Sequence, residues 1–101
     1  MSRADILRAA AAIFQEKGYH AASMQDIAEA VELQKGSLYH HVTSKQEILL
    51  ALLDEALDLI IERLQIVEKK DLSPSLKLRQ AMQAYFSFMA ENQSLSSVLL
   101  L

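Results

Sequence analysis

Helix starts are the feature of this sequence that most constrains its fold. Three times, a serine stands three residues before an acid and at the head of an apolar run with helical spacing. The three pairs are Ser2 with Asp5, Ser23 with Asp26, and Ser44 with Glu47. In such a capping box the serine side chain accepts the backbone N–H of the acid, and the acid reaches back to the backbone N–H of the serine. The boxes predict helices over residues 2–17, over 24–31 and from 45 to about 69, and the third box is expected to be the best formed.

The rest of the chain adds helices and no strands. Pro74 is placed to begin a helix that fades near Asn92, and residues 94–101 start another. The chain holds only two glycines and one proline, and no alternating apolar pattern competes with the helical one. We therefore expect an all-α fold, with a three-helix head, a long connecting helix and part of a helical bundle.

Several classes of protein are disfavoured. The chain has no cysteine, so it has no disulfide framework and no cysteine-based zinc site. The N-terminus is charged where a signal peptide is apolar, and no run approaches a membrane span. No nucleophile–base pair or metal set is visible, so we expect no enzyme, no cofactor, no membrane contact and a cytoplasmic location.

Charge is distributed unevenly. The net charge is −3, but residues 1–45 hold five basic and five acidic side chains, so the deficit lies in residues 46–101. No acid occurs between Leu33 and Lys45. A local positive potential is enough to attract a polyanion, so the net charge does not exclude nucleic acid.

A helix-turn-helix is expected where two short helices, 24–31 and 35–42, are separated by a few residues. At 100° per residue, Leu38 and Val42 face the core. An outward face remains, which is small, polar and free of acids. Its members are Lys35, Gly36, Ser37, Tyr39 and His40.

The chemistry of this outward face suits the major groove of DNA. Gly36 lets the backbone approach closely, and Ser37 and His40 can donate or accept at base edges. Tyr39 can hydrogen-bond a phosphate through its hydroxyl group.

Two helix starts add anion sites beside this face. Lys45 and the N–H groups after Ser44 are expected to bind one phosphate. The helix that begins at Ser23 offers a second such site, and Gln25 lies near enough to touch a base.

The segment SMQDIAEAVELQKGSLYHHVTSKQEIL, residues 23–49, resembles the DNA-binding domain of the tetracycline-repressor (TetR) family. The resemblance extends over residues 3 to about 53. It implies a DNA-binding domain over residues 1–45 and the first part of a ligand-binding and dimerisation domain over 46–101. It also implies a homodimeric transcriptional regulator, a ligand-responsive repressor of a palindromic operator, with double-stranded DNA and an unknown small-molecule effector as partners. The DNA contacts that it implies are Ser23, Gln25, Lys35, Ser37, Tyr39, His40 and Lys45.

Two departures from the family pattern stand out. The family usually has glycine in the turn of the helix-turn-helix, where this chain has Glu32. A left-handed residue there costs a non-glycine roughly 1 kcal/mol, so a slightly different turn is expected. Family members are also longer, and the terminal Leu99, Leu100 and Leu101 are typical of a helix that continues, so we expect a fragment.

Three alternatives remain open. The domain can be a helical protein-interaction module without DNA binding. His40 and His41 can be a metal pair, although adjacent helical residues diverge and helical zinc pairs are four apart. A stripe of Met82, Tyr85, Phe86 and Met89 can line a ligand pocket, but such a stripe is more often plain core.

Overall fold

The computed structural model describes residues 1–100, which form helices and no strand. The elements are α1 (Arg3–Lys17), α2 (Met24–Ala30), α3 (Lys35–Leu38), α4 (Lys45–Glu68), α5 (Pro74–Glu91), α6 (Gln93–Ser96) and the 3₁₀ helix η1 (Ser97–Leu100). The all-α prediction is confirmed.

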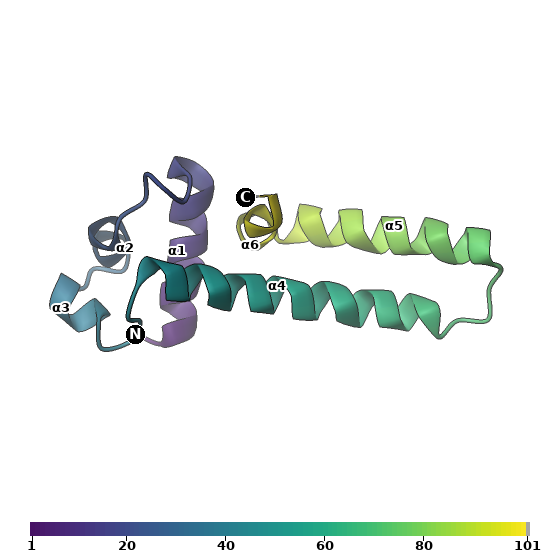
Figure 1. Ribbon diagram of the computed structural model, residues 1–101, viewed down its shortest axis with the longest axis horizontal. Coiled ribbons are helices and arrows are strands. Elements are labelled where there is room, and N and C mark those ends of the chain that lie inside the picture. Colours follow the sequence, from purple (N-terminus) through teal and green to yellow (C-terminus); the bar gives the residue numbers. More distant parts are fainter. Residues whose placement is uncertain (101) are drawn as a thin grey trace.

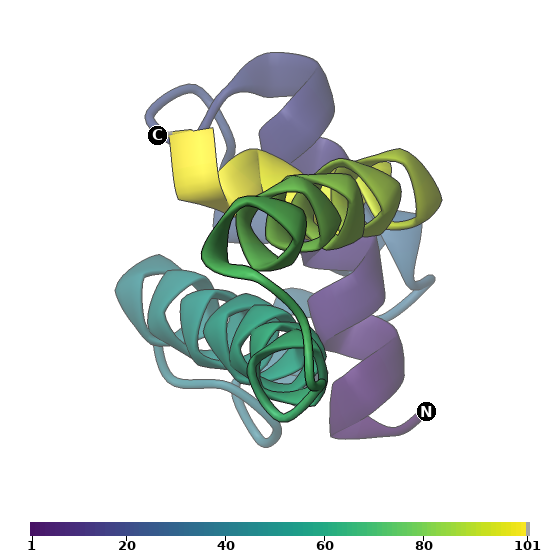
Figure 2. The ribbon, with the colours of Figure 1, turned by 90° about the vertical axis from the view of Figure 1, so that its right-hand side faces the viewer.

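The molecule is elongated, with extents of 54 × 22 × 18 Å, because α4 carries the chain far from its head (Figure 1). Helices α1 to α3 form the head around the first turns of α4, and α5 returns antiparallel to α4. Figure 2 shows α5 stacked beside α4 and the C-terminal α6 and η1 next to α1. The α4–α5 hairpin is therefore joined to the head both by the start of α4 and by the segment that follows α5.

Capping follows the predicted boxes at two of three helices. Ser2 and Ser23 each accept the N–H of the acid three residues on, and each acid accepts the serine N–H in return. At α4, Ser44 Oγ accepts the Glu47 N–H over 3.0 Å, but the Glu47 carboxylate bonds to Thr43 instead. The expectation that the third box is the best formed is wrong, because Thr43 offers the same carboxylate oxygen both an N–H and a hydroxyl.

Helix α3 is shorter than the predicted 35–42. Beyond Leu38 the backbone tightens, since the His40 N–H donates to Ser37 and the His41 N–H to Leu38, each only three residues back. Residues 39–41 are turns, because the chain must leave the helix axis to reach the cap of α4 at Ser44. The prediction that the α-helix continues beyond Leu38 to Val42 is therefore wrong.

The core joins the head to the hairpin in one cluster. Its largest fully buried side chains are Ile6, Ile27, Leu38, Val42, Ile48, Leu52 and Phe88. The burial of Leu38 and Val42 confirms the predicted inward side of the α3 segment.

The C-terminal segment closes the core against α1. Leu95 and Val98 are buried, and Ser94 Oγ lies 2.7 Å from Gln15 Oε1. The predicted helix over residues 94–101 is confirmed in residues 94–100, as parts of α6 and η1, while Leu101 lies outside the described residues.

Candidate nucleic-acid interface

The turn of the helix-turn-helix joins α2 to α3 through Glu32. This glutamate adopts φ 57°, in the left-handed region that favours glycine. The chain therefore keeps the glycine-type turn in spite of its side chain, and the expected change in the turn does not occur. Glu32 is exposed, so its carboxylate lies on the solvent side of the turn.

The outward face, formed by Lys35, Gly36, Ser37, Tyr39 and His40, is exposed throughout. Tyr39 keeps 44% of its accessible surface although its neighbour Leu38 is fully buried. A Cβ atom added at Gly36 would meet nothing within 4 Å, so an incoming surface can approach the backbone there. The structure thus brings all five residues together as the sequence predicts.

The start of α2 carries Ser23 and Gln25, and both residues are exposed. Ser23 Oγ accepts the Asp26 N–H over 3.0 Å, which leaves its own hydrogen to donate to an acceptor outside the protein. Gln25 is exposed, and its Nε2 atom donates to Glu29 Oε1 over 3.2 Å. The Ser23 N–H and the nearby Lys17 ammonium lower the pKa of Asp26, so this acid stays charged.

Lys45 lies at the first position of α4, but its side chain turns toward the loop between α1 and α2. Its Nζ atom lies 2.7 Å from the Tyr19 carbonyl oxygen, 3.1 Å from that of Ala22 and 3.4 Å from that of His20. The same ammonium lies 4.3 Å from the centroid of the Tyr19 ring. The sequence predicts a phosphate contact for Lys45, whereas the structure gives its charge protein partners.

Glu47, in the same turn of α4, contacts the loop that follows α3. Its carboxylate accepts the Thr43 N–H over 2.8 Å and the Thr43 hydroxyl, and it pairs with Arg3 at 3.2 Å. The Thr43 hydroxyl and N–H and the Arg3 guanidinium lower the pKa of Glu47. Sequence reasoning missed Tyr19 and Arg3 because local spacing carries no signal for contacts between residues 26 and 44 positions apart. It missed Thr43, only four residues from Glu47, because the capping pattern assigned the Glu47 carboxylate to Ser44.

Neither a cluster of metal-ligating side chains nor a membrane-spanning helix occurs within the part of the chain that the structure describes. Among residues 1–100, no group of three or more His, Asp or Glu side chains is placed to hold a metal ion. His41 is half-buried, and His40 is exposed on the outward face. No helix within this range is long and apolar enough to span a bilayer.

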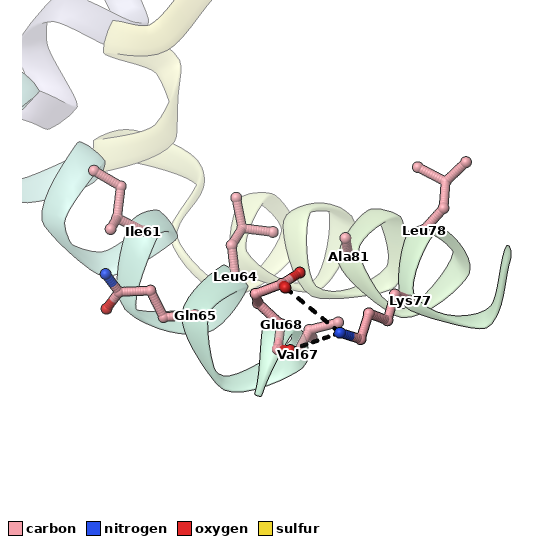
Figure 3. A pocket seen from close by; sticks show the side chains of 8 residues that line it. All are labelled: Ile61, Leu64, Gln65, Val67, Glu68, Lys77, Leu78 and Ala81. Atoms are coloured by element: carbon pink, nitrogen blue, oxygen red, sulfur yellow. Dashed lines mark hydrogen bonds and ion pairs between the residues drawn. The ribbon is translucent and has the colours of Figure 1, made fainter. Parts of the chain in front are cut away.

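A second candidate surface is an open groove between α4 and α5, close to the distal end of the hairpin (Figure 3). Its apolar lining includes Ile61 and Leu64 from α4 and Leu78 and Ala81 from α5, and Lys77 pairs with Glu68 at its edge.

The predicted pocket stripe on α5 divides into two pairs. Met82 and Phe86 are 51% and 60% exposed, so the reading of these two as plain core is wrong. Tyr85 and Met89 are partly buried against the core. At 100° per residue the four residues lie within an arc of about 100°, with Met82 and Phe86 at one edge of the stripe and Tyr85 and Met89 at the other.

Known proteins resemble the chain in both sequence and fold. Residues 6–52 match the sequence profile of the bacterial regulatory proteins of the tetR family. The HTH-type transcriptional activator FasR of Mycolicibacterium smegmatis is 35% identical over 85% of this chain and 39% of its own length. The HTH-type transcriptional repressor KstR2 of Mycobacterium tuberculosis is 36% identical over 83% of this chain and 42% of its own.

Solved structures agree with these relatives. The ketosteroid transcriptional regulator KstR2 of Mycobacterium tuberculosis superposes with a TM-score of 0.90 at 31% identity, over 95% of this chain and 49% of that one. The TetR family transcriptional regulator PfmR from Thermus thermophilus gives 0.85 at 38% identity, over 94% and 52%. The chain thus spans about half the length of these structures and about two fifths of the curated relatives. The family match falls on the helix-turn-helix and the start of α4 that form the candidate interface, and the chain belongs to the tetR family of bacterial regulatory proteins.

Proposed function

We propose that this chain is the DNA-binding part of a sequence-specific transcriptional regulator. The observation that carries the proposal is the outward face of α3, which is exposed, polar and free of acids while Leu38 on the opposite side is fully buried. A helix held in this way can enter a major groove without disturbing the core. The names of the relatives, all transcriptional regulators, favour this function over a protein-interaction module.

Side-chain chemistry divides the outward face into two roles. Ser37 and His40 contact base edges, where a hydroxyl or imidazole can donate or accept. Gly36 allows the backbone to approach the sugar-phosphate chain, and Lys35 and Tyr39 bind phosphates.

The start of α2 supplies a second set of contacts. The Ser23 hydroxyl still has a hydrogen to donate to a phosphate, and Gln25 reaches a neighbouring base from the exposed side of α2. Lys45 belongs to this interface by its place at the start of α4, but its ammonium is already bound within the protein.

The regulator acts as a homodimer, with two copies of α3 in successive major grooves of a palindromic operator. KstR2, named as a repressor, supports repression as its mode of action. An effector that binds near Met82, Tyr85, Phe86 and Met89 would move α4 and change the spacing of the two heads. Such an effector must prefer the arrangement that does not bind DNA, because equal affinity for both arrangements shifts nothing.

The test is selection of the full-length protein on a pool of random-sequence duplexes at two salt concentrations. A palindromic site with half-sites about one helical turn apart is expected, with an affinity that falls steeply as salt rises. Absence of any enriched sequence, together with binding that is insensitive to salt, would overturn the proposal.

A further inference from the structure

The first turn of α4 holds both ends of the helix-turn-helix. On one side, the Lys45 ammonium binds the carbonyls of the loop that leads into α2. On the other, the Glu47 carboxylate binds the N–H and hydroxyl of Thr43, in the loop that leaves α3. In Figure 1 the start of α4 lies between these two loops. The orientation of α2 and α3 relative to α4 therefore depends on two oppositely charged side chains in the same turn of helix.

We propose that Lys45 is a positioning residue for DNA binding, whose ammonium sets the α1–α2 loop on α4 and neutralises no phosphate. This inference rests on the proposed function, because it concerns how the same interface is oriented. It differs from the phosphate contact that the sequence predicts for Lys45.

The geometry of the ammonium supports this role. A lysine ammonium has three N–H donors, and three carbonyl oxygens lie within 3.4 Å of Nζ. The face of the Tyr19 ring adds a fourth, electron-rich partner at 4.3 Å. The donors are thus satisfied inside the protein, and moving the charge to a phosphate would break these charge-assisted bonds to the carbonyls.

The loop also needs the cation. The carbonyls of Tyr19, His20 and Ala22 converge on one point, where their negative ends repel one another unless a positive group lies between them. Tyr19 is fixed in turn by an edge contact with Phe14 in the core, with ring centroids 5.2 Å apart. Lys45 therefore couples the loop before α2 to both α4 and the core.

Lys35 provides a matched comparison. It is exposed on the outward face, and within residues 1–100 it has no side-chain hydrogen bond or ion pair. The same change to methionine, which keeps the apolar stem and removes the charge, therefore separates the two roles. A lysine that binds phosphate contributes about 0.9 to the slope of log affinity against log salt, whereas a positioning lysine contributes nothing to that slope.

The experiment compares Lys45→Met and Lys35→Met in the full-length protein, on a duplex recovered from the random pool. We expect Lys45→Met to weaken binding by about tenfold, the worth of one charge-assisted hydrogen bond, with an unchanged salt slope. Lys35→Met is expected to lower the slope by about 0.9. A slope lowered by Lys45→Met would overturn the inference in favour of a phosphate contact, and unchanged affinity would overturn it in favour of a role in stability alone.

Two further measurements distinguish the positioning role of Lys45 from a general loss of folding. Amide hydrogen exchange without DNA should accelerate at residues 18–23 in Lys45→Met and remain unchanged in Lys35→Met. Lys45→Arg, which keeps a cation and several donors, should recover most of the affinity. If no duplex is enriched even with the unaltered protein, the proposed function fails rather than this assignment.

Discussion

The backbone N–H of Leu33 donates to the carbonyl of Ala28, five residues earlier, over 2.9 Å. The Glu32 N–H donates to the Glu29 carbonyl over 3.1 Å, inside this larger loop. Together the two bonds form a Schellman motif that ends α2, with Glu32 at its left-handed position. Glycine is the usual residue there because a Cβ atom crowds the following carbonyl.

Replacement of Glu32 by glycine is therefore expected to stabilise the fold. Relative to Glu32→Ala, which also removes the charge but keeps the Cβ atom, Glu32→Gly should gain about 0.5–1 kcal/mol, after the greater freedom of glycine in the unfolded chain is counted. Urea denaturation of the two variants measures the difference. Equal midpoints would show that the left-handed conformation of Glu32 carries no strain.

The packing of α3 against the core depends on Leu38. Leu38→Ala should lower the free energy of unfolding by about 2–5 kcal/mol, because Leu38 is fully buried and its loss leaves a cavity. Leu78, which is 63% exposed on α5, gives the control, and Leu78→Ala should change stability by less than about 0.5 kcal/mol. Thermal and urea unfolding measure both variants. Similar losses from the two would mean that burial in this structure does not describe the folded protein.

Local patterns predicted most of the fold. The cap serines mark the starts of α1, α2 and α4, and Pro74 begins α5, because capping and proline geometry depend on residues only three or four apart. The outward face around Ser37 was likewise predictable, since the helical period alone opposes it to Leu38.

The contacts that orient the interface could not be predicted in this way. Lys45 reaches Tyr19 and Glu47 reaches Arg3 only because α1 and α4 cross in the folded head. Nothing in the local sequence indicates that these charged side chains meet those partners. The early end of α3 also depends on tertiary structure, because Leu38 and Val42 must both be buried while Ser44 caps α4.

The cap of α2 predicts a dependence of stability on pH. The Ser23 N–H holds the pKa of Asp26 below its ordinary value of 3.8, so the unfolded chain binds this proton more readily than the folded one. The stabilisation is therefore complete above that value and is lost as the pH falls through the lowered pKa. Asp26→Asn should be less stable than the unaltered protein at neutral pH, and the difference should shrink on acidification.

Urea midpoints at neutral pH and at about pH 2.5 measure this dependence. Asp58→Asn is the control, because Asp58 is exposed on α4 and makes no hydrogen bond or ion pair among residues 1–100. Asp58→Asn should have the same midpoint as the unaltered protein at each of the two pH values. An Asp26→Asn deficit of the same size at both pH values would show that the charge of Asp26 does not stabilise the cap.

The two roles assigned to the outward face can be separated at Ser37 and Tyr39. Ser37→Ala should relax the preference at one base position, by about 1 kcal/mol of discrimination, because a base edge loses its partner. Tyr39→Phe should weaken binding to all duplexes by a similar factor, since a phosphate is the same in every sequence. Neither change removes a charge, so the salt slope should stay constant in both variants.

Repeated selection and competition binding with both variants make these measurements. A uniform loss for Ser37→Ala, or a base-specific loss for Tyr39→Phe, would exchange the two roles and place the Tyr39 hydroxyl, which lies on an exposed side chain, at a base edge instead.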